Sequence, residues 1–200
     1  MNEKSVFYFA YGSNMSSKIF QHGFRRLKPS SAERATLEGY RLSFSEAGIP
    51  FFEPGFANIE VDPAAMVEGV LYQITEKEMD DLHISEGGRA YNIIEISVHG
   101  LLSGPVQALT FQSKEVAHGL LPSKRYVEIL IDGAQEHSLS EAWVTMLKNT
   151  AYVDRTSFRH IRVVVLRIVR WMRQLGLPHP FRWWKRHHIK KTKRRHVRGS

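Results

Sequence analysis

The chain has 200 residues, of which 42% are hydrophobic and 24% are charged, values that suit a globular core and exclude a mainly disordered or fibrous chain. It contains no cysteine, which excludes a disulfide scaffold, a thiolate metal site, an iron–sulfur cluster and a cysteine nucleophile. The net charge of +8 is unevenly divided: residues 1–150 contain 13 basic and 19 acidic side chains, whereas residues 151–200 contain 15 basic ones and a single acid, Asp154. We therefore predict a domain over 1–150 and a basic extension over 151–200.

The first residues do not have the pattern of a targeting sequence. The apolar run over 6–10 is too short for a signal peptide and ends in turn-forming residues. The most apolar later segment, 161–175, is interrupted by four arginines and does not have the composition of a transmembrane helix. We expect a cytoplasmic protein.

Strands are predicted mainly in the first two thirds of the chain. Residues 6–10 are aromatic and β-branched and stop at a turn, which is typical of a buried strand. Segment 13–24 is predicted to be a short helix or a loop. Segment 47–63 is rich in Gly, Pro and Phe and is predicted to be a loop with short extended pieces. Further strands are predicted over 35–44, 67–74, 91–98 and 106–111.

Helices are predicted after two capping-box patterns and after one proline. Thr75 and Glu78 predict a helix that runs to about residue 82, followed by a glycine-containing loop over 85–89. A second helix is predicted from Pro122, with apolar residues at helical spacing. The second capping-box pattern, Ser138 and Glu141, predicts a last helix whose inward face is formed by Ala142, Trp143, Met146 and Leu147.

This order of elements contains too few β-α-β repeats for a doubly wound parallel sheet. We predict an α+β fold in which a curled, mostly antiparallel sheet or small barrel is flanked by short helices. A C-terminal basic helical extension is expected to follow it.

Two short segments carry candidate chemistry. Residues 11–14, Tyr-Gly-Ser-Asn, directly follow the first strand; the glycine lets the backbone approach a ligand, and successive N–H groups in such a turn can bind an anion. The same tetrapeptide is also typical of a simple strand-end turn. Glu86, followed by two glycines, is either an exposed loop residue or a base that a substrate can reach.

Residues 8–15, Tyr-Phe-Ala-Tyr-Gly-Ser-Asn-Met, closely resemble the N-terminal signature of the γ-glutamylcyclotransferase family, whose usual form is Tyr-Gly-Ser-Asn-Leu. Met15 replaces the leucine, which keeps size and polarity. Three further segments follow in the family's order. Residues 57–72 resemble its central strand pair, 82–91 its catalytic-glutamate loop, and 122–134 with the following helix its C-terminal block. The resemblance covers about residues 6–147.

The resemblance implies an enzyme that cyclises the γ-glutamyl group of a γ-glutamyl amino acid or γ-glutamyl amine to 5-oxoproline, without a metal or organic cofactor. It implies that Glu86 is the general acid and base and that backbone N–H groups of the turn hold the oxyanion. Tyr91 and Tyr126 would offer hydroxyls to the substrate, although both positions also suit core residues. The substrate-binding residues implied in total are Tyr11, Gly12, Ser13, Asn14, Tyr91 and Tyr126.

The basic extension lies outside the resemblance. Five arginines between 159 and 173 fall on one side of a helix and apolar residues on the other, and aromatic residues between cations follow at 181–186. Three interpretations stay open for 159–198: its helix packs on the domain, it binds an anionic membrane surface, or it binds nucleic acid. An alternative function for the whole chain is a non-catalytic ligand-binding module that this extension directs to an anionic membrane or nucleic acid.

Overall fold

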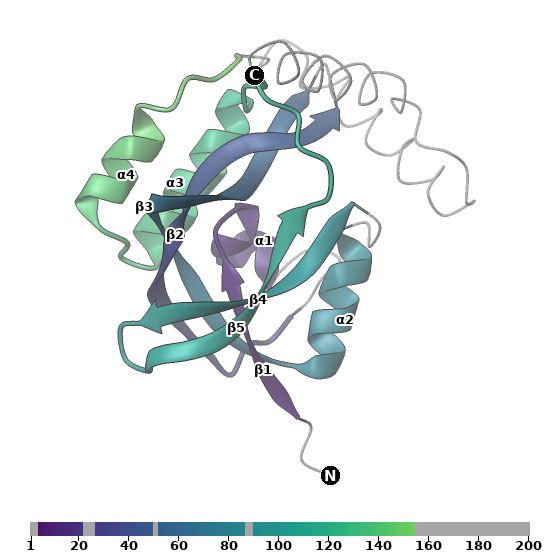
Figure 1. Ribbon diagram of the computed structural model, residues 1–200, viewed down its shortest axis with the longest axis vertical. Helices are drawn as coiled ribbons and strands as arrows, with labels where there is room; N and C mark the ends of the chain where they lie inside the picture. The colour runs from purple at the N-terminus through teal and green to yellow at the C-terminus, as the bar shows by residue number, and fades with distance from the viewer. Residues whose placement is uncertain (1–3, 22–26, 50–51, 87–89, 155–200) are drawn as a thin grey trace. The chain divides into compact units, whose positions relative to one another are not determined.

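The structure is a computed structural model that describes residues 4–21, 27–49, 52–86 and 90–154. The predicted basic helix and cationic tail, 159–198, lie outside these residues. The described elements, labelled in Figure 1, follow the chain as β1 (Ser5–Ala10), the 3₁₀ helix η1 (Ser13–Met15), α1 (Ser17–Phe20), β2 (Ser31–Ile49), β3 (Glu53–Thr75), α2 (Glu76–Ser85), β4 (Tyr91–Gly100), β5 (Gly104–Ser113), α3 (Lys124–Glu136) and α4 (Glu141–Lys148).

The strands form a closed barrel in the order β1-β3-β2-β4-β5. β1 pairs antiparallel with the end of β3, from Ser5 opposite Thr75 to Ala10 opposite Val70. The β2–β4 and β4–β5 pairs are also antiparallel, and a parallel pairing between β5 and β1 closes the barrel. The predicted α+β fold, with a curled and mostly antiparallel sheet flanked by short helices, is confirmed.

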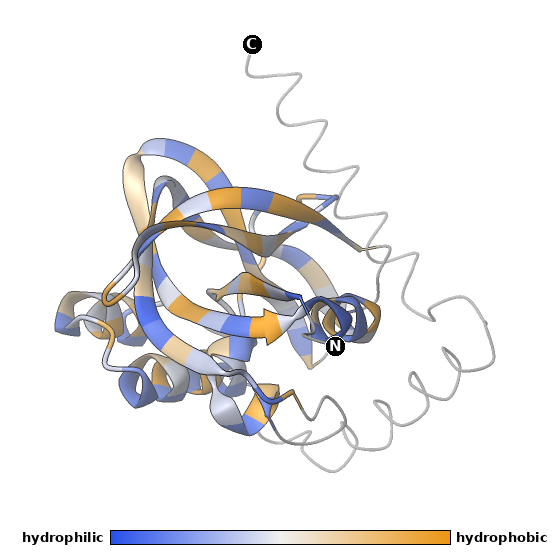
Figure 2. Cartoon of the chain, turned by 90° about the horizontal axis from the view of Figure 1, so that it is seen from below, coloured by the Kyte–Doolittle hydropathy of each residue, from blue (hydrophilic) through white to orange (hydrophobic). Residues whose placement is uncertain are grey.

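The hydropathy pattern of the strands determines which side chains fill the barrel. Successive side chains of a strand point to opposite faces, so one apolar side chain in two can be buried. In β4, Ile96 and Val98 are buried, whereas Glu95, Ser97 and His99 are exposed. Figure 2 shows the same alternation of hydrophobic and hydrophilic residues along the strands.

The prediction of a loop over 47–63 is wrong, because these residues belong largely to the two longest strands, β2 and β3. A Cβ atom added at Gly48 would lie 2.1 Å from the carbonyl oxygen of Glu53 and 2.5 Å from the ring of Phe56. Glycine is thus required here by the close approach of neighbouring groups and not by a turn. Composition alone could not separate these two reasons for a glycine.

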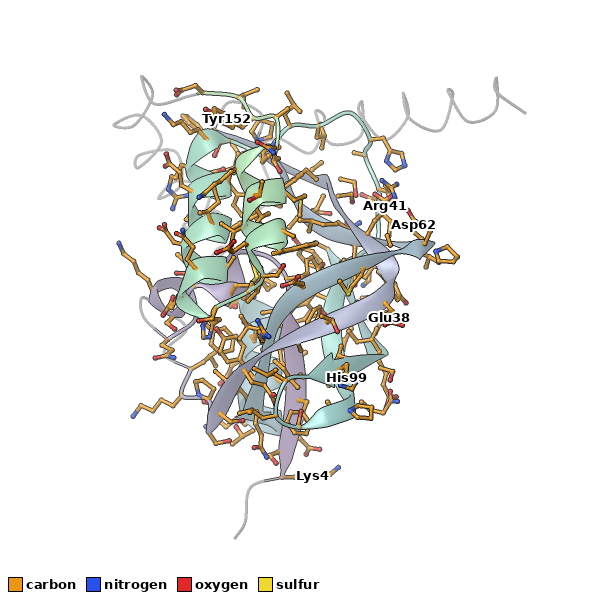
Figure 3. All side chains as sticks on the ribbon, turned by 90° about the vertical axis from the view of Figure 1, so that its left-hand side faces the viewer. Lys4, Glu38, Arg41, Asp62, His99 and Tyr152 are labelled. Atoms are coloured by element: carbon orange, nitrogen blue, oxygen red, sulfur yellow. The ribbon has the colours of Figure 1, made fainter. Side chains whose placement is uncertain are left out.

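Polar contacts link the exposed parts of β2 and β3. A guanidinium nitrogen of Arg41 lies 2.5 Å from a carboxylate oxygen of Glu60, and its Nε lies 3.9 Å from Asp62 Oδ2. Figure 3 shows Arg41 and Asp62 beside each other at one edge of the two strands. Ion pairs near the surface, where Arg41 lies, contribute about 0–1 kcal/mol each.

Gly69, in β3, is a position where we expect a single methyl group to be destabilising. A Cβ atom there would lie 2.4 Å from the carbonyl oxygen of Ala10 and 2.8 Å from Cζ of the fully buried Phe9. Gly69→Ala is therefore expected to lower the free energy of unfolding by about 1–3 kcal/mol through overpacking. Urea denaturation followed by circular dichroism measures the change, and an unchanged midpoint and slope would contradict this close packing.

The N-cap of α4 differs from the prediction. Ser140 and not Ser138 caps the helix, because its side-chain oxygen accepts a hydrogen bond from the N–H of Trp143 at 3.1 Å. Glu68 of β3 accepts the N–H of Ser140 at 2.8 Å, which ties the cap to the barrel. The inward face therefore differs from the predicted one. Trp143 and Leu147 are buried as predicted, Val144 is buried as well, and Ala142 and Met146 are exposed.

The chain divides into two compact units. The first contains residues 1–43, 57–114 and 127–150, and thus the paired segments of the barrel, α2, α4 and most of α3. From residue 127 onward α3 lies beside α4, as Figures 1 and 3 show. The second contains, among the described residues, those within 44–56, 115–126 and 151–154. The predicted boundary between 150 and 151 stays a prediction, since residues after 154 are not described.

The second unit has its own buried polar contact. The carboxylate of Glu53 is buried and accepts hydrogen bonds from the hydroxyl of Ser123 and from Arg125 Nη1, the latter at 2.9 Å. The ring of Tyr126 packs edge-on against Phe56, with centroids 5.2 Å apart. These contacts hold the first turn of α3.

No helix within the described residues is both long enough and apolar enough to cross a bilayer.

Candidate active site

The turn at the end of β1 forms one wall of the candidate site. Tyr11 is buried and donates its hydroxyl hydrogen to the carbonyl oxygen of Phe111 on β5, which holds the end of β1 against the barrel. The chain then bends into η1, where the N–H of Met15 bonds to the carbonyl oxygen of Gly12 at 3.0 Å. Gly12 and Ser13 are half-buried and Asn14 is buried.

The carboxylate of Glu86 lies at this turn. Its Oε1 accepts a hydrogen bond from Asn14 Nδ2 at 3.0 Å, and the same amide nitrogen donates to the hydroxyl of Tyr8 at 2.9 Å. An amide nitrogen has two hydrogens, one for each of these acceptors. The two segments that the sequence singled out, 72 residues apart, therefore meet in the fold through Asn14.

Element lengths explain why they meet. The capping box of Thr75 and Glu78, confirmed in the structure, begins α2 at the residue where β3 ends, opposite Ser5 at the start of β1. α2 then packs along β1 (Figure 1), and its ten residues rise about 15 Å, close to the length of a six-residue strand. Glu86, the C-cap residue, thereby arrives at the other end of β1, where the turn lies.

Tyr8, which accepts a hydrogen bond from Asn14, also belongs to a cluster of aromatic rings. Phe111 lies at their centre: Tyr8, Tyr91 and His83 have ring centroids 5.5, 6.0 and 5.8 Å from it. Tyr91, at the start of β4, is half-buried and packs on Phe111, whose carbonyl oxygen accepts the hydrogen bond from Tyr11. His83 comes from α2, three residues before Glu86.

Tyr126 has a different surrounding from the other predicted site residues. It belongs to the second unit, where its buried ring packs against Phe44 and Phe56. Its predicted contact with the substrate stays a prediction.

Within the described part of the chain, no cluster of three or more His, Asp or Glu side chains could hold a metal ion.

The sequence interpretation missed Tyr8, which the structure brings to Asn14. A tyrosine within the apolar first strand, three residues before Tyr11, was a usable signal, because a buried phenol usually finds a hydrogen-bond partner. Its ring stacks on Phe20, with planes 7° apart, and Phe20 stacks in turn on Tyr72 at a centroid distance of 4.2 Å. Three parallel rings therefore support the turn.

A second polar group, formed by Tyr72 and His137, lies beside this stack. Tyr72 donates to the carbonyl oxygen of Met15 at 3.0 Å, and its hydroxyl lies 3.2 Å from His137 Nε2. Burial raises the pKa of the Tyr72 phenol well above its ordinary value of 10, and the nearby Glu136 and Tyr8 act in the same direction. Tyr72 is therefore a protonated donor at any pH at which the protein is folded.

Burial lowers the pKa of His137 below its ordinary value of 6.5, against the opposing effects of Glu136 and the Met15 carbonyl. As the pH falls below about 6.5, the unfolded chain binds this proton before the folded chain does, so the free energy of unfolding decreases. The part of the free energy of unfolding that depends on neutral His137 is fully present above pH 6.5. It is lost as the pH falls through the lowered pKa of the folded state. In His137→Gln we expect a smaller loss of stability between pH 7 and 5, measured by urea denaturation; equal slopes in both proteins would contradict it.

Comparisons with known proteins show what this chain is similar to. The model of the AIG2-like family matches residues 66–147. A γ-glutamyl cyclotransferase of Aspergillus oryzae is 29% identical over 174 residues, covering 74% of this chain and 62% of its own length. One of Claviceps purpurea is 31% identical over 136 residues, covering 62% and 61%. A solved structure of a γ-glutamyl cyclotransferase superposes with a TM-score of 0.67 at 25% identity, covering 76% of this chain and 92% of that one.

The chain is thus similar to γ-glutamyl cyclotransferases in sequence and in fold. The comparisons support the resemblance found in the sequence, and the solved structure confirms the fold that it implied. The chain spans about three fifths of the length of the two fungal relatives, so their activity and substrates are considered for it only as proposals.

Proposed function

We propose that this chain is a γ-glutamylcyclotransferase that releases 5-oxoproline from a γ-glutamyl amino acid or a γ-glutamyl amine. The observation that carries the proposal is the 3.0 Å contact between Glu86 Oε1 and Asn14 Nδ2 at the end of β1. It brings one carboxylate to a turn whose residues suit the binding of a polar group. The names of the two fungal relatives support the same activity.

The reaction is an intramolecular transfer of an acyl group. The α-amino nitrogen of the γ-glutamyl group attacks its own γ-carbonyl carbon and forms the new C–N bond of a five-membered lactam. The bond from that carbon to the amide nitrogen breaks, and the free amine or amino acid leaves. No water is consumed. The protein has to hold the substrate folded, and holding reacting groups in place can contribute about 7–11 kcal/mol.

In the proposed mechanism Glu86 moves the protons. The neutral α-amino group loses one proton as the new bond forms, and the leaving nitrogen gains one as the old bond breaks. One carboxylate within reach of both nitrogens can accept the first proton and deliver it to the second. The hydrogen bond from Asn14 would keep Glu86 Oε1 in place beside the turn.

The turn has a separate role in the proposal. Negative charge develops on the γ-carbonyl oxygen as the α-amine attacks, and backbone N–H groups stabilise such an oxyanion best when they are held in place beforehand. We assign this role to the N–H groups of Gly12, Ser13 and Asn14, and we assign contacts with the rest of the substrate to the side chains of Tyr11, Tyr91 and Tyr126. These assignments rest on the family resemblance.

A panel of substrates tests the proposal. Purified protein is incubated with γ-glutamyl-alanine, a γ-glutamyl amine and glutathione, and 5-oxoproline is measured by chromatography. Release from at least one compound is the expected result. Binding of these compounds without release from any of them would overturn the proposal in favour of a non-catalytic binding module. The location in the cytoplasm and the anionic partner of 159–198 stay predictions.

A further inference from the structure

Three contacts tie the C-terminal end of α3 to the segment that directly follows the turn. A Cβ atom added at Gly133 would lie 2.8 Å from Ser16 N and 2.9 Å from Met15 C. Glu136 Oε2 accepts the N–H of Ser17 at 3.1 Å. The third contact runs through Tyr72, which bonds to the Met15 carbonyl and lies within hydrogen-bond distance of His137. α3 therefore packs directly on the backbone that presents Asn14.

The hydrogen bonds define the state of the His137 ring. The carbonyl oxygen of Met15 can only accept, so it takes the single hydroxyl hydrogen of Tyr72. The phenol oxygen must then accept from His137 Nε2 at 3.2 Å. Neutral His137 thus carries its hydrogen on Nε2. The two rings meet edge to face, with planes 89° apart, so packing and hydrogen bonding favour the same orientation.

The two tyrosines of the stack hold consecutive residues of the turn. Tyr8 and Tyr72 are direct partners in the β1–β3 pair. Tyr8 accepts from the side-chain amide of Asn14, and Tyr72 donates to the main-chain carbonyl of Met15. Tyr72 is fully buried. A shift of the Met15 carbonyl would therefore move Asn14 and the hydrogen bond that it makes to Glu86.

We propose that Tyr72 and His137 are positioning residues for the active site, and that they act by holding the Met15 carbonyl so that Asn14 orients Glu86. This inference rests on the proposed function, because it states what the orientation is for. Neither residue needs to touch the substrate. Misplacement of reacting groups by about 1 Å can cost about 10²-fold in rate, so the loss of a hydroxyl behind the turn is expected to have a measurable effect.

Tyr72→Phe tests the inference, because it removes the hydroxyl and keeps the ring in the stack. We expect kcat for 5-oxoproline release to fall by about 10- to 100-fold per folded protein, with KM changed less than threefold. Tyr152→Phe, at an exposed tyrosine of the second unit, is the matched control and should keep the wild-type rate. A kcat within about twofold of wild type in a folded Tyr72→Phe protein would overturn the inference.

A second readout does not depend on activity. The side-chain amide signals of Asn14 are followed by NMR in an acid titration, with Glu86→Gln as the reference that lacks the carboxylate. In wild type they should respond to protonation of Glu86, and in Tyr72→Phe this response should shrink. An unchanged response would overturn the inference. If wild type forms no 5-oxoproline, the proposed function fails, and the NMR response alone decides whether Tyr72 positions Asn14.

His137 supplies an independent pair of variants in case Tyr72→Phe does not fold. His137→Gln keeps an N–H donor close to the position of Nε2, whereas His137→Ala removes it. We expect His137→Gln to retain kcat within about threefold and His137→Ala to lose about tenfold. Equal rates in both variants would show that the donor to Tyr72 has no positioning role.

Discussion

Glu86→Gln is expected to lower the rate of 5-oxoproline release by about 10²–10⁴-fold, which is the usual contribution of one positioned acid–base group. The substitution preserves the size of the side chain and an oxygen that can still accept the hydrogen bond from Asn14. It removes the group that accepts and returns the proton. The measurement is the initial rate with the best substrate of the panel, together with circular dichroism to establish that the variant is folded.

Glu76→Gln is the matched control for this prediction. Glu76 lies on the same helix, and its carboxylate makes an exposed ion pair with Lys4 at 2.8 Å. Such a pair contributes little to stability, and it lies at the opposite end of α2 from Glu86. The control should retain the wild-type rate. Equal rates for wild type and Glu86→Gln would remove Glu86 from the mechanism, even if the wild-type protein is active.

Phe20→Ala is expected to have the largest effect on stability. Phe20 is fully buried, and its ring lies between those of Tyr8 and Tyr72 with planes 7° and 12° from theirs. Removal of a buried phenyl group costs about 3–5 kcal/mol, because folding then buries less apolar surface and because a cavity remains where the ring was. The variant is also expected to lose activity, since the stack supports Asn14 through the hydroxyl of Tyr8.

Denaturation in urea measures the change in the free energy of unfolding for Phe20→Ala. Leu102→Ala is the control, because Leu102 is 84% exposed and its truncation should change stability by no more than about 0.5 kcal/mol. A loss below about 1 kcal/mol in Phe20→Ala would mean that the surrounding rings collapse into the space. The packing of the three rings would then not be what holds the turn.

Local signals in the sequence were sufficient for most elements. The capping box at Thr75 predicted the start of α2, and the apolar runs predicted β1, β4 and β5, because these patterns depend on neighbours within a few residues. The extent of β2 and β3 was not accessible in this way. Gly48 and Gly69 lie in strands, and they are glycines because other groups approach them closely; such contacts involve residues that the local pattern does not contain.

The last helix illustrates the same limit. Ser138 and Ser140 both precede α4, and the spacing to Glu141 favoured Ser138. The structure selects Ser140, because Glu68 of β3 holds its N–H and thereby determines where the helix begins. The packing of α4 likewise decides which side chains face inward: Val144 is buried and Met146 is exposed.

By itself the sequence determined the class of fold, the two segments that carry the candidate chemistry, and the resemblance to a family, since these depend on residue type, spacing and order along the chain. Only the tertiary structure decided that Asn14 joins Glu86 to Tyr8, and that Tyr72 and His137 lie behind the turn. The physical reason is that a side-chain hydrogen bond needs donor and acceptor within about 3 Å. Residues 72 or 65 positions apart reach that distance only once the barrel has closed and α2 and α3 have packed against it.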